Sequence, residues 1–129
     1  MNRLGIALVL VSLAATARAD APSSAKAAQD RVDAAGAAYQ LIEKRWEAGA
    51  STTDQVCEWS ERWYQAIVDS GAKGKSLTSA ADAYVQRMSA ISQLTDQKVK
   101  AGIVGTDDAM IVTYYVAEAA MYAARVRGK

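Results

Sequence analysis

The same turn pattern occurs twice in the chain, as Ala48-Gly49-Ala50-Ser51-Thr52-Thr53-Asp54 and, 53 residues later, as Ala101-Gly102-Ile103-Val104-Gly105-Thr106-Asp107. Each copy has an Ala-Gly break, a short connection and a Thr-Asp start to a new apolar-periodic segment. Glycine supplies the left-handed conformation that ends many helices, and Thr or Asp satisfies the free amides at the start of the next helix. The pattern predicts two helix-turn-helix units, related either by duplication or by convergence on the same capping chemistry.

Apolar residues recur at steps of three and four on both sides of each turn, which is the spacing of one helix face. Thr52 and Gln55 additionally have the spacing of a capping box. A solvated stretch of glycine, lysine and serine separates the second segment from the third. We expect helices over residues 22–48, 52–70, 77–101 and 105–127, with a loop at 71–76.

Four such helices with short connections favour an all-α fold, in which two antiparallel helical hairpins form a four-helix up-down-up-down bundle. The hairpins cover residues 22–70 and 77–127 of one helical domain that spans residues 20–129. Helical spacing also predicts which face each helix buries. In the fourth helix the expected core face carries Met110, Ala117, Met121 and Ala124.

The first 19 residues have the layout of a secretory signal peptide. Arg3 gives a positive start, residues 4–15 are apolar apart from Ser12, and Ala17-Arg18-Ala19 fits a small-x-small cleavage site. A spanning helix needs about 20 apolar residues, so we prefer a cleaved signal to an uncleaved membrane anchor. We expect a protein exported to the periplasm or secreted, with no integral membrane segment after cleavage.

The charge and composition of the chain limit the classes of partner that we expect it to bind. Lys and Arg number 15 and Asp and Glu 14, for a formal net charge of +1, and the two signs are interspersed. Nucleic-acid-binding domains carry a basic patch or stripe, which is missing here. We expect no nucleic-acid partner, and we expect a protein partner or self-association instead.

The chain has no histidine. This removes the commonest general base and the histidine-bearing zinc and di-iron sites. Met88, Met110 and Met121 could bind copper(I) through their thioethers, but methionines at helical spacing usually fill core gaps. Glu58 and Glu61 share a helix face and are interpreted as solvated. We therefore expect no enzyme, no catalytic residue, no metal and no cofactor.

The single cysteine, Cys57, cannot form an internal disulfide. In an exported protein an odd cysteine is either buried and inert or a link between chains. Free cysteine is among the most buried residue types, so we expect Cys57 to lie in the core.

Aromatic side chains are the candidate contacts for a ligand or a partner. They gather around the first turn and in the fourth helix: Trp46, Trp59, Trp63, Tyr114 and Tyr115. Trp46 and Trp59 flank the first turn and are expected to meet across the hairpin. Core packing is the ordinary role of such residues, and a binding surface is the alternative, because aromatics are enriched at interfaces.

The two turns also resemble a known family. Arg45-Trp46-Glu47-Ala48-Gly49 and Lys98-Val99-Lys100-Ala101-Gly102, each followed by a Thr/Asp-rich helix start, resemble the turn of TolC-type outer-membrane efflux proteins. Thr52, Val56 and Asp108 match that pattern, whereas Gln55, Gly105 and Ala109 depart from it. The resemblance covers roughly 25 residues twice and implies a coiled-coil-like helical hairpin in an exported protein. It does not imply a pore.

These observations lead to two functional hypotheses. The first is an exported, non-enzymatic helical protein that acts by helix–helix contact, as a scaffold or as a partner of an envelope complex related to efflux. The second is a small-molecule carrier with an aromatic-lined cavity between its helices.

Overall fold

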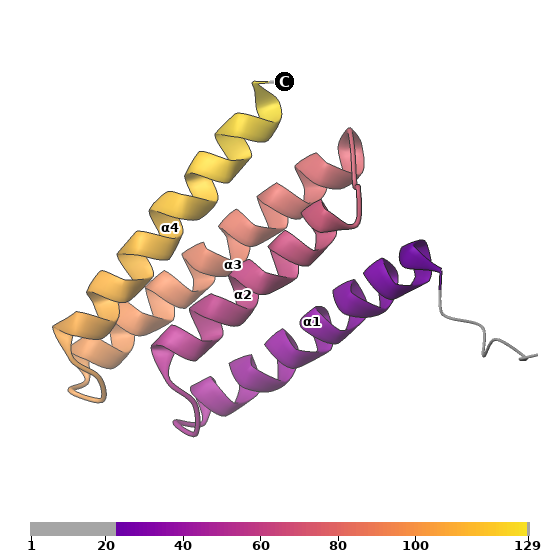
Figure 1. The fold of residues 1–129 in the computed structure, drawn as a ribbon. Helices are drawn as coiled ribbons and strands as arrows, with labels where there is room; N and C mark the ends of the chain where they lie inside the picture. The colour runs from indigo at the N-terminus through magenta and orange to yellow at the C-terminus, as the bar shows by residue number, and fades with distance from the viewer. Residues whose placement is uncertain (1–22, 129) are drawn as a thin grey trace, which may run out of the picture.

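The computed structural model describes residues 23–128. They form four helices and, within that range, no strand (Figure 1). The helices are α1 (Ser24–Glu47), α2 (Thr53–Asp69), α3 (Lys75–Lys100) and α4 (Thr106–Arg127). The predicted all-α class is confirmed, and the predicted signal peptide at residues 1–19 lies outside the described residues.

The third helix begins two residues earlier than the sequence pattern predicts. Gly74 stands at its N-cap with φ of 57°, and its carbonyl accepts from the Thr78 amide at 3.0 Å. This left-handed backbone is open to glycine and strained for most other residues. The predicted loop at 71–76 is therefore shorter, because Gly74 turns the chain directly into the helix at Lys75.

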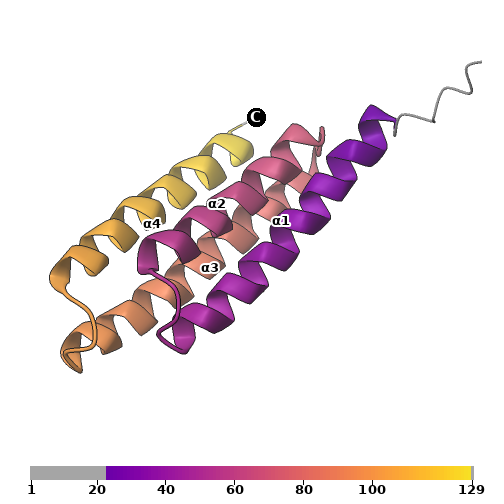
Figure 2. The same ribbon diagram turned by 60° about the horizontal axis from the view of Figure 1, so that its bottom comes forward.

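Helix α2 is the centre of the arrangement. It packs against α1, α3 and α4, and α3 also packs against α4. Helices α1 and α4 lie on opposite sides of α2 and do not approach each other closely (Figure 1 and Figure 2). The structure is thus a three-helix core of α2, α3 and α4, with α1 added along α2.

Large side chains from all four helices fill the core. The most completely buried of them are Trp46, Tyr84, Met88, Ile91, Val56 and Val112. The rings of Tyr64 and the partly buried Tyr122 stack at 5.4 Å between centroids, and Tyr64 stacks on Tyr84 at the same distance. Aromatic pairs of this kind bury much apolar area and add a geometric preference of their own. The tyrosine stack therefore ties α2, α3 and α4 together.

The two turns end their helices in the same way. Gly49 and Gly102 are both left-handed, with φ of 78° and 70°. In each turn the glycine amide and the next amide donate to carbonyls of the last helical turn, as in a Schellman motif. These bonds join Gly49 to Trp46 (3.0 Å), Ala50 to Arg45 (2.7 Å), Gly102 to Val99 (3.0 Å) and Ile103 to Lys98 (2.8 Å).

The turns start the following helices differently. Thr52 accepts from the Gln55 amide at 3.1 Å, and the Gln55 side chain accepts from the Thr52 amide at 3.0 Å. The predicted capping box is therefore confirmed at α2. Gly105 occupies the place of Thr52 in the second copy and gives α4 no side-chain cap.

The predicted core face of the fourth helix is wrong. Met110 and Met121 are exposed, by 73% and 42%, and Ala117 and Ala124 are exposed as well. The buried face is the opposite one, with Val112, Ala119 and Ala123. Both faces are apolar at helical spacing, so the sequence pattern fits either, and packing against α3 and α2 selects the second.

Candidate functional site

The two turns meet at one end of the molecule. The Lys98 Nζ, from the end of α3, donates to the Trp46 carbonyl at 2.7 Å and lies 4.0 Å from the centre of the Trp46 ring. A small pocket of about 270 Å³ lies between the turns, lined by Gly49, Thr52 and Ile103 among others. Lys98 therefore joins α3 to the end of α1, although the backbones of these helices stay apart.

Trp46 is a core residue. Its side chain is 2% exposed, and its indole N–H donates to the Thr53 hydroxyl at 3.1 Å. This bond satisfies the hydroxyl of Thr53, which is buried, whereas Thr106, its counterpart in the second turn, is exposed. The expected pairing of Trp46 with Trp59 is not found among the aromatic contacts of residues 23–128, because Trp46 faces Lys98 instead.

Trp63 and Trp59 lie between α1 and α2. Trp63 packs against Tyr39, with 5.7 Å between ring centroids, and against the backbone of Gly36. A Cβ at Gly36 would lie 2.9 Å from the Trp63 ring, so only glycine lets the two helices approach this closely. Trp59 is partly exposed beside a cleft of about 350 Å³ and is covered by the Arg62 guanidinium.

A partly buried arginine, which the sequence pattern did not predict as a site residue, lies among these rings. The Arg87 guanidinium lies 4.6 Å from the centre of the Trp63 ring and 5.4 Å from that of Tyr39. It donates to the Ser60 hydroxyl at 2.8 Å and to the Ser60 carbonyl at 3.0 Å. Burial lowers its pKa from the ordinary value. Its position one residue before Met88, beside a core face, is the signal that could have identified it.

A second polar cluster joins α2, α3 and α4. Glu118 accepts from the Tyr84 hydroxyl at 3.1 Å and from the Tyr114 hydroxyl at 3.0 Å. Burial raises the pKa of Glu61 on α2, and the neighbouring Glu118 carboxyl raises it further. Burial likewise raises the pKa of Tyr84, and Glu118 adds to the effect.

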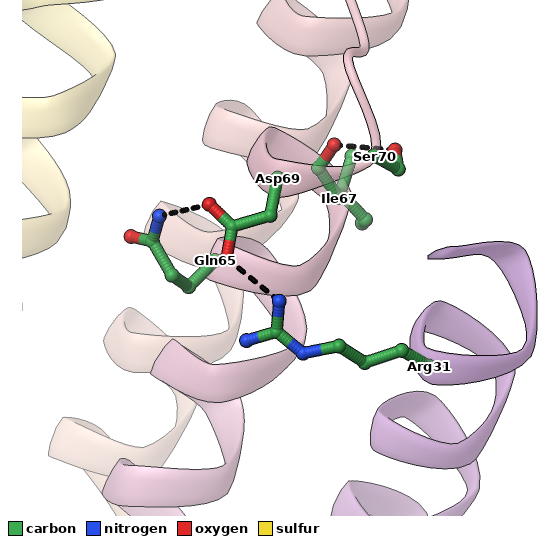
Figure 3. Close-up of polar contacts among 5 residues, drawn as sticks. All are labelled: Arg31, Gln65, Ile67, Asp69 and Ser70. Carbon is green, nitrogen blue, oxygen red and sulfur yellow. Dashed lines mark hydrogen bonds and ion pairs between the residues drawn. The ribbon is translucent and has the colours of Figure 1, made fainter. Parts of the chain in front are cut away.

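An open cleft of about 460 Å³ lies over α2, between α1 and α4. Acidic residues of α2 line it together with Arg31, Arg62, Gln65 and Tyr115. Arg31 reaches from α1 to Asp69 at the end of α2, at 2.7 Å, and the Gln65 amide donates to the other Asp69 oxygen at 2.9 Å (Figure 3). These two donors hold the pKa of Asp69 below its ordinary value. Both arginines of this cleft form ion pairs within the chain, Arg31 with Asp69 and Arg62 with Glu58.

Cys57 is fully buried, as predicted. Burial raises the pKa of its thiol to about 12, and the Asp54 carboxylate adds to this effect. The thiolate, which is the reactive form, is therefore disfavoured at neutral pH. The residue acts as a small apolar group in the core.

Helix α4 carries an exposed apolar face, which we call the open α4 face. It consists of residues at steps of four and three along the helix: Met110, Tyr114, Ala117, Met121 and Ala124. Tyr114, one of the predicted contact residues, is 61% exposed here, whereas Tyr115 is partly buried against the core. Between Asp108 and Arg125 the only charged residue of α4 is Glu118.

Comparison of the chain with protein-family models, with curated proteins and with solved structures finds no match. In the described part of the chain, no helix is both long enough and apolar enough to span a bilayer. The same residues contain no cluster of three or more acidic or cysteine side chains placed to hold a metal ion. The candidate site therefore depends on the geometry of this chain alone.

Proposed function

We propose that this protein is exported and acts, without catalysis, by helix–helix contact through the open α4 face. It serves as a scaffold or as a partner of an envelope complex. The observation that carries the proposal is that α4 is apolar on both faces although only one of them is buried. A helix that is hydrophobic all round is normally buried on all sides. A contiguous exposed apolar face marks an interaction site.

The geometry favours contact over the carrier hypothesis. Among the predicted aromatic residues, Trp46 is packed in the core, and the Arg87 guanidinium covers the ring of Trp63. The hollows beside Trp59 and Trp63, of about 350 and 440 Å³, are open clefts at the surface, whereas a carrier needs a cavity that encloses its ligand. Tyr114, by contrast, presents its ring to solvent on the open α4 face.

The remaining parts of the proposal come from the sequence. Residues 1–19 would direct export to the periplasm or outside the cell, and the near-neutral charge argues against nucleic acid as the partner. The helices would run up-down-up-down, with the two hairpins arising by duplication. The resemblance of both turns to those of TolC-type proteins supports a link to efflux.

In-cell photo-crosslinking tests the proposal. A photo-reactive amino acid replaces Ala117, in the middle of the open α4 face, and in a control chain it replaces Leu41, which is 51% exposed on α1. We expect a covalent protein adduct at position 117 and little or none at position 41. Equal labelling at both positions, or none at 117, would contradict the proposed contact.

A further inference from the structure

The two helix-turn-helix units carry equivalent surfaces, and one of these surfaces is more deeply buried than the other. With the turns aligned at their 53-residue spacing, Cys57, Tyr64 and Val68 of α2 correspond to Met110, Ala117 and Met121 of α4. The α2 residues face the second hairpin, where Tyr64 stacks on Tyr84 and Cys57 is fully buried. The α4 residues form the open α4 face. The surface that joins the first hairpin to the second thus recurs on α4 without a partner in the described chain.

We propose that a second copy of this chain covers the open α4 face, with the two α4 helices antiparallel. This inference rests on the proposed function, because it names the partner in that contact. Steps of four and three over residues 110–124 are the seam of a two-stranded helical contact. Over 15 residues the seam is about 21 Å long.

The charges at the ends of α4 determine whether the two α4 helices of the dimer run parallel or antiparallel. Asp107 and Asp108 lie in the first turn, and Arg125 and Arg127 lie in the last. In an antiparallel pair the acidic end of each helix meets the basic end of the other, whereas a parallel pair would place like charges together. Arg127 already pairs with Asp82 of its own chain, which leaves Arg125 to meet the Asp107 of the second copy.

Side-chain size fits the same arrangement. Ala117 lies midway between Met110 and Ala124, so an antiparallel pair centred on Ala117 places each Met110 opposite the Ala124 of the other copy. A small residue at the crossing point allows a close approach, and large side chains meet small ones at the ends. Glu118 does not oppose this contact, because its two oxygens accept from Tyr84 and Tyr114.

Two helices alone form a contact at the small end of specific interfaces, about 1,200 Å² in total or less. The dimer is therefore concentration-dependent. It is measured by sedimentation equilibrium on protein purified from cells that express the full chain. A monomer–dimer equilibrium is expected. A strict monomer at the highest attainable concentration would overturn self-pairing, and a series of species larger than a dimer would overturn the closed antiparallel arrangement.

Charge reversal tests the direction. Asp107→Arg and Arg125→Asp, each alone, are expected to weaken dimerisation by about five- to tenfold, since both symmetric ion pairs are lost. A chain that carries both changes should dimerise as well as the unmodified chain does. Lack of restoration, with circular dichroism showing an intact fold, would overturn the antiparallel pairing. Leu41→Glu on α1 is the matched control and leaves dimerisation unchanged.

Disulfide formation tests the relative direction of the two α4 helices independently of how tightly the two copies bind. Chains that carry Asp107→Cys are mixed with chains that carry Arg125→Cys and oxidised. The antiparallel pair predicts disulfides between positions 107 and 125 of different chains, and disulfides joining only like positions would overturn it. If photo-crosslinking at Ala117 captures a different protein and never a second copy, self-pairing fails while the proposed contact function stands.

Discussion

Helices α2 and α4 follow the same turn but meet different surroundings. Helix α2 starts from a full capping box, presents a charged outer surface, and packs against all three other helices. Helix α4 starts without a side-chain cap and keeps an apolar face in solvent. A shared turn therefore determines where a helix stops and starts, whereas the neighbouring hairpin determines how much of its apolar surface is covered.

The largest expected difference between the two turns is at Trp46 and its counterpart Val99. Trp46→Ala should lower the free energy of unfolding by about 3–5 kcal/mol, because it removes a buried ring, its hydrogen bond to Thr53 and its contact with the Lys98 ammonium. Val99→Ala, at a partly buried site, should cost about 1 kcal/mol. Urea denaturation of both variants measures the difference, and equal losses would mean that the first turn is not the better packed.

Gly36 tests the packing of α1 on α2. Gly36→Ala places a methyl group 2.9 Å from the Trp63 ring. Overpacking of this kind typically costs about 1–3 kcal/mol, partly offset by the better helix propensity of alanine. Ser89→Ala, at the equivalent exposed position in α3, is the control and should be neutral or slightly stabilising. A stable Gly36→Ala variant with unchanged Trp fluorescence would contradict the close approach of the two helices.

The two left-handed glycines should behave alike. Gly49→Ala and Gly102→Ala should each lower stability by about 1 kcal/mol, because both place a side chain at positive φ in open space. Thermal denaturation of the two variants provides the comparison. Losses that differ by more than a few tenths of a kcal/mol would show that the turns are not equivalent.

Substitutions at the two helix starts should change the stability of the protein in opposite directions. Thr52→Ala should cost about 1 kcal/mol, because it removes the capping box of α2. Gly105→Asn should stabilise the protein by a few tenths of a kcal/mol, because it supplies the missing cap of α4 while the exposed Asp107 side chain moves aside. A loss of stability in Gly105→Asn would indicate that Asp107 holds this position.

Glu61 should make the stability of the fold depend on pH. Because the folded pKa of Glu61 is raised, its favourable contribution is present below the ordinary glutamate pKa and is lost as the pH rises through the folded value. Glu61→Gln should therefore stabilise the protein at pH 7 by about half a kcal/mol, a small gain because solvent screens the group. Glu58→Gln, which loses an ion pair with Arg62, should show no such gain.

The sequence predicted the four helices and both glycine stops, because capping residues and helical spacing act locally. It misplaced the start of α3, since the left-handed backbone of Gly74 shortens the loop. It also selected the wrong face of α4, because Met110 and Val112 each begin an apolar series at helical spacing. Periodicity identifies a helix but cannot choose between two apolar faces. Arg87 was missed because its partners, Tyr39 and Trp63, come from other helices.

Equivalent positions of the two helices are buried in α2 and exposed in α4, where we propose that a second copy covers them. Cys57 and Met110 are such a pair, so thiol labelling of a Met110→Cys chain tests both at once, with each site followed by peptide mass. We predict slow labelling of Cys57 at all concentrations, and fast labelling at position 110 that slows as the protein concentration rises. Fast labelling of Cys57, or labelling at position 110 that does not depend on concentration, would contradict the account.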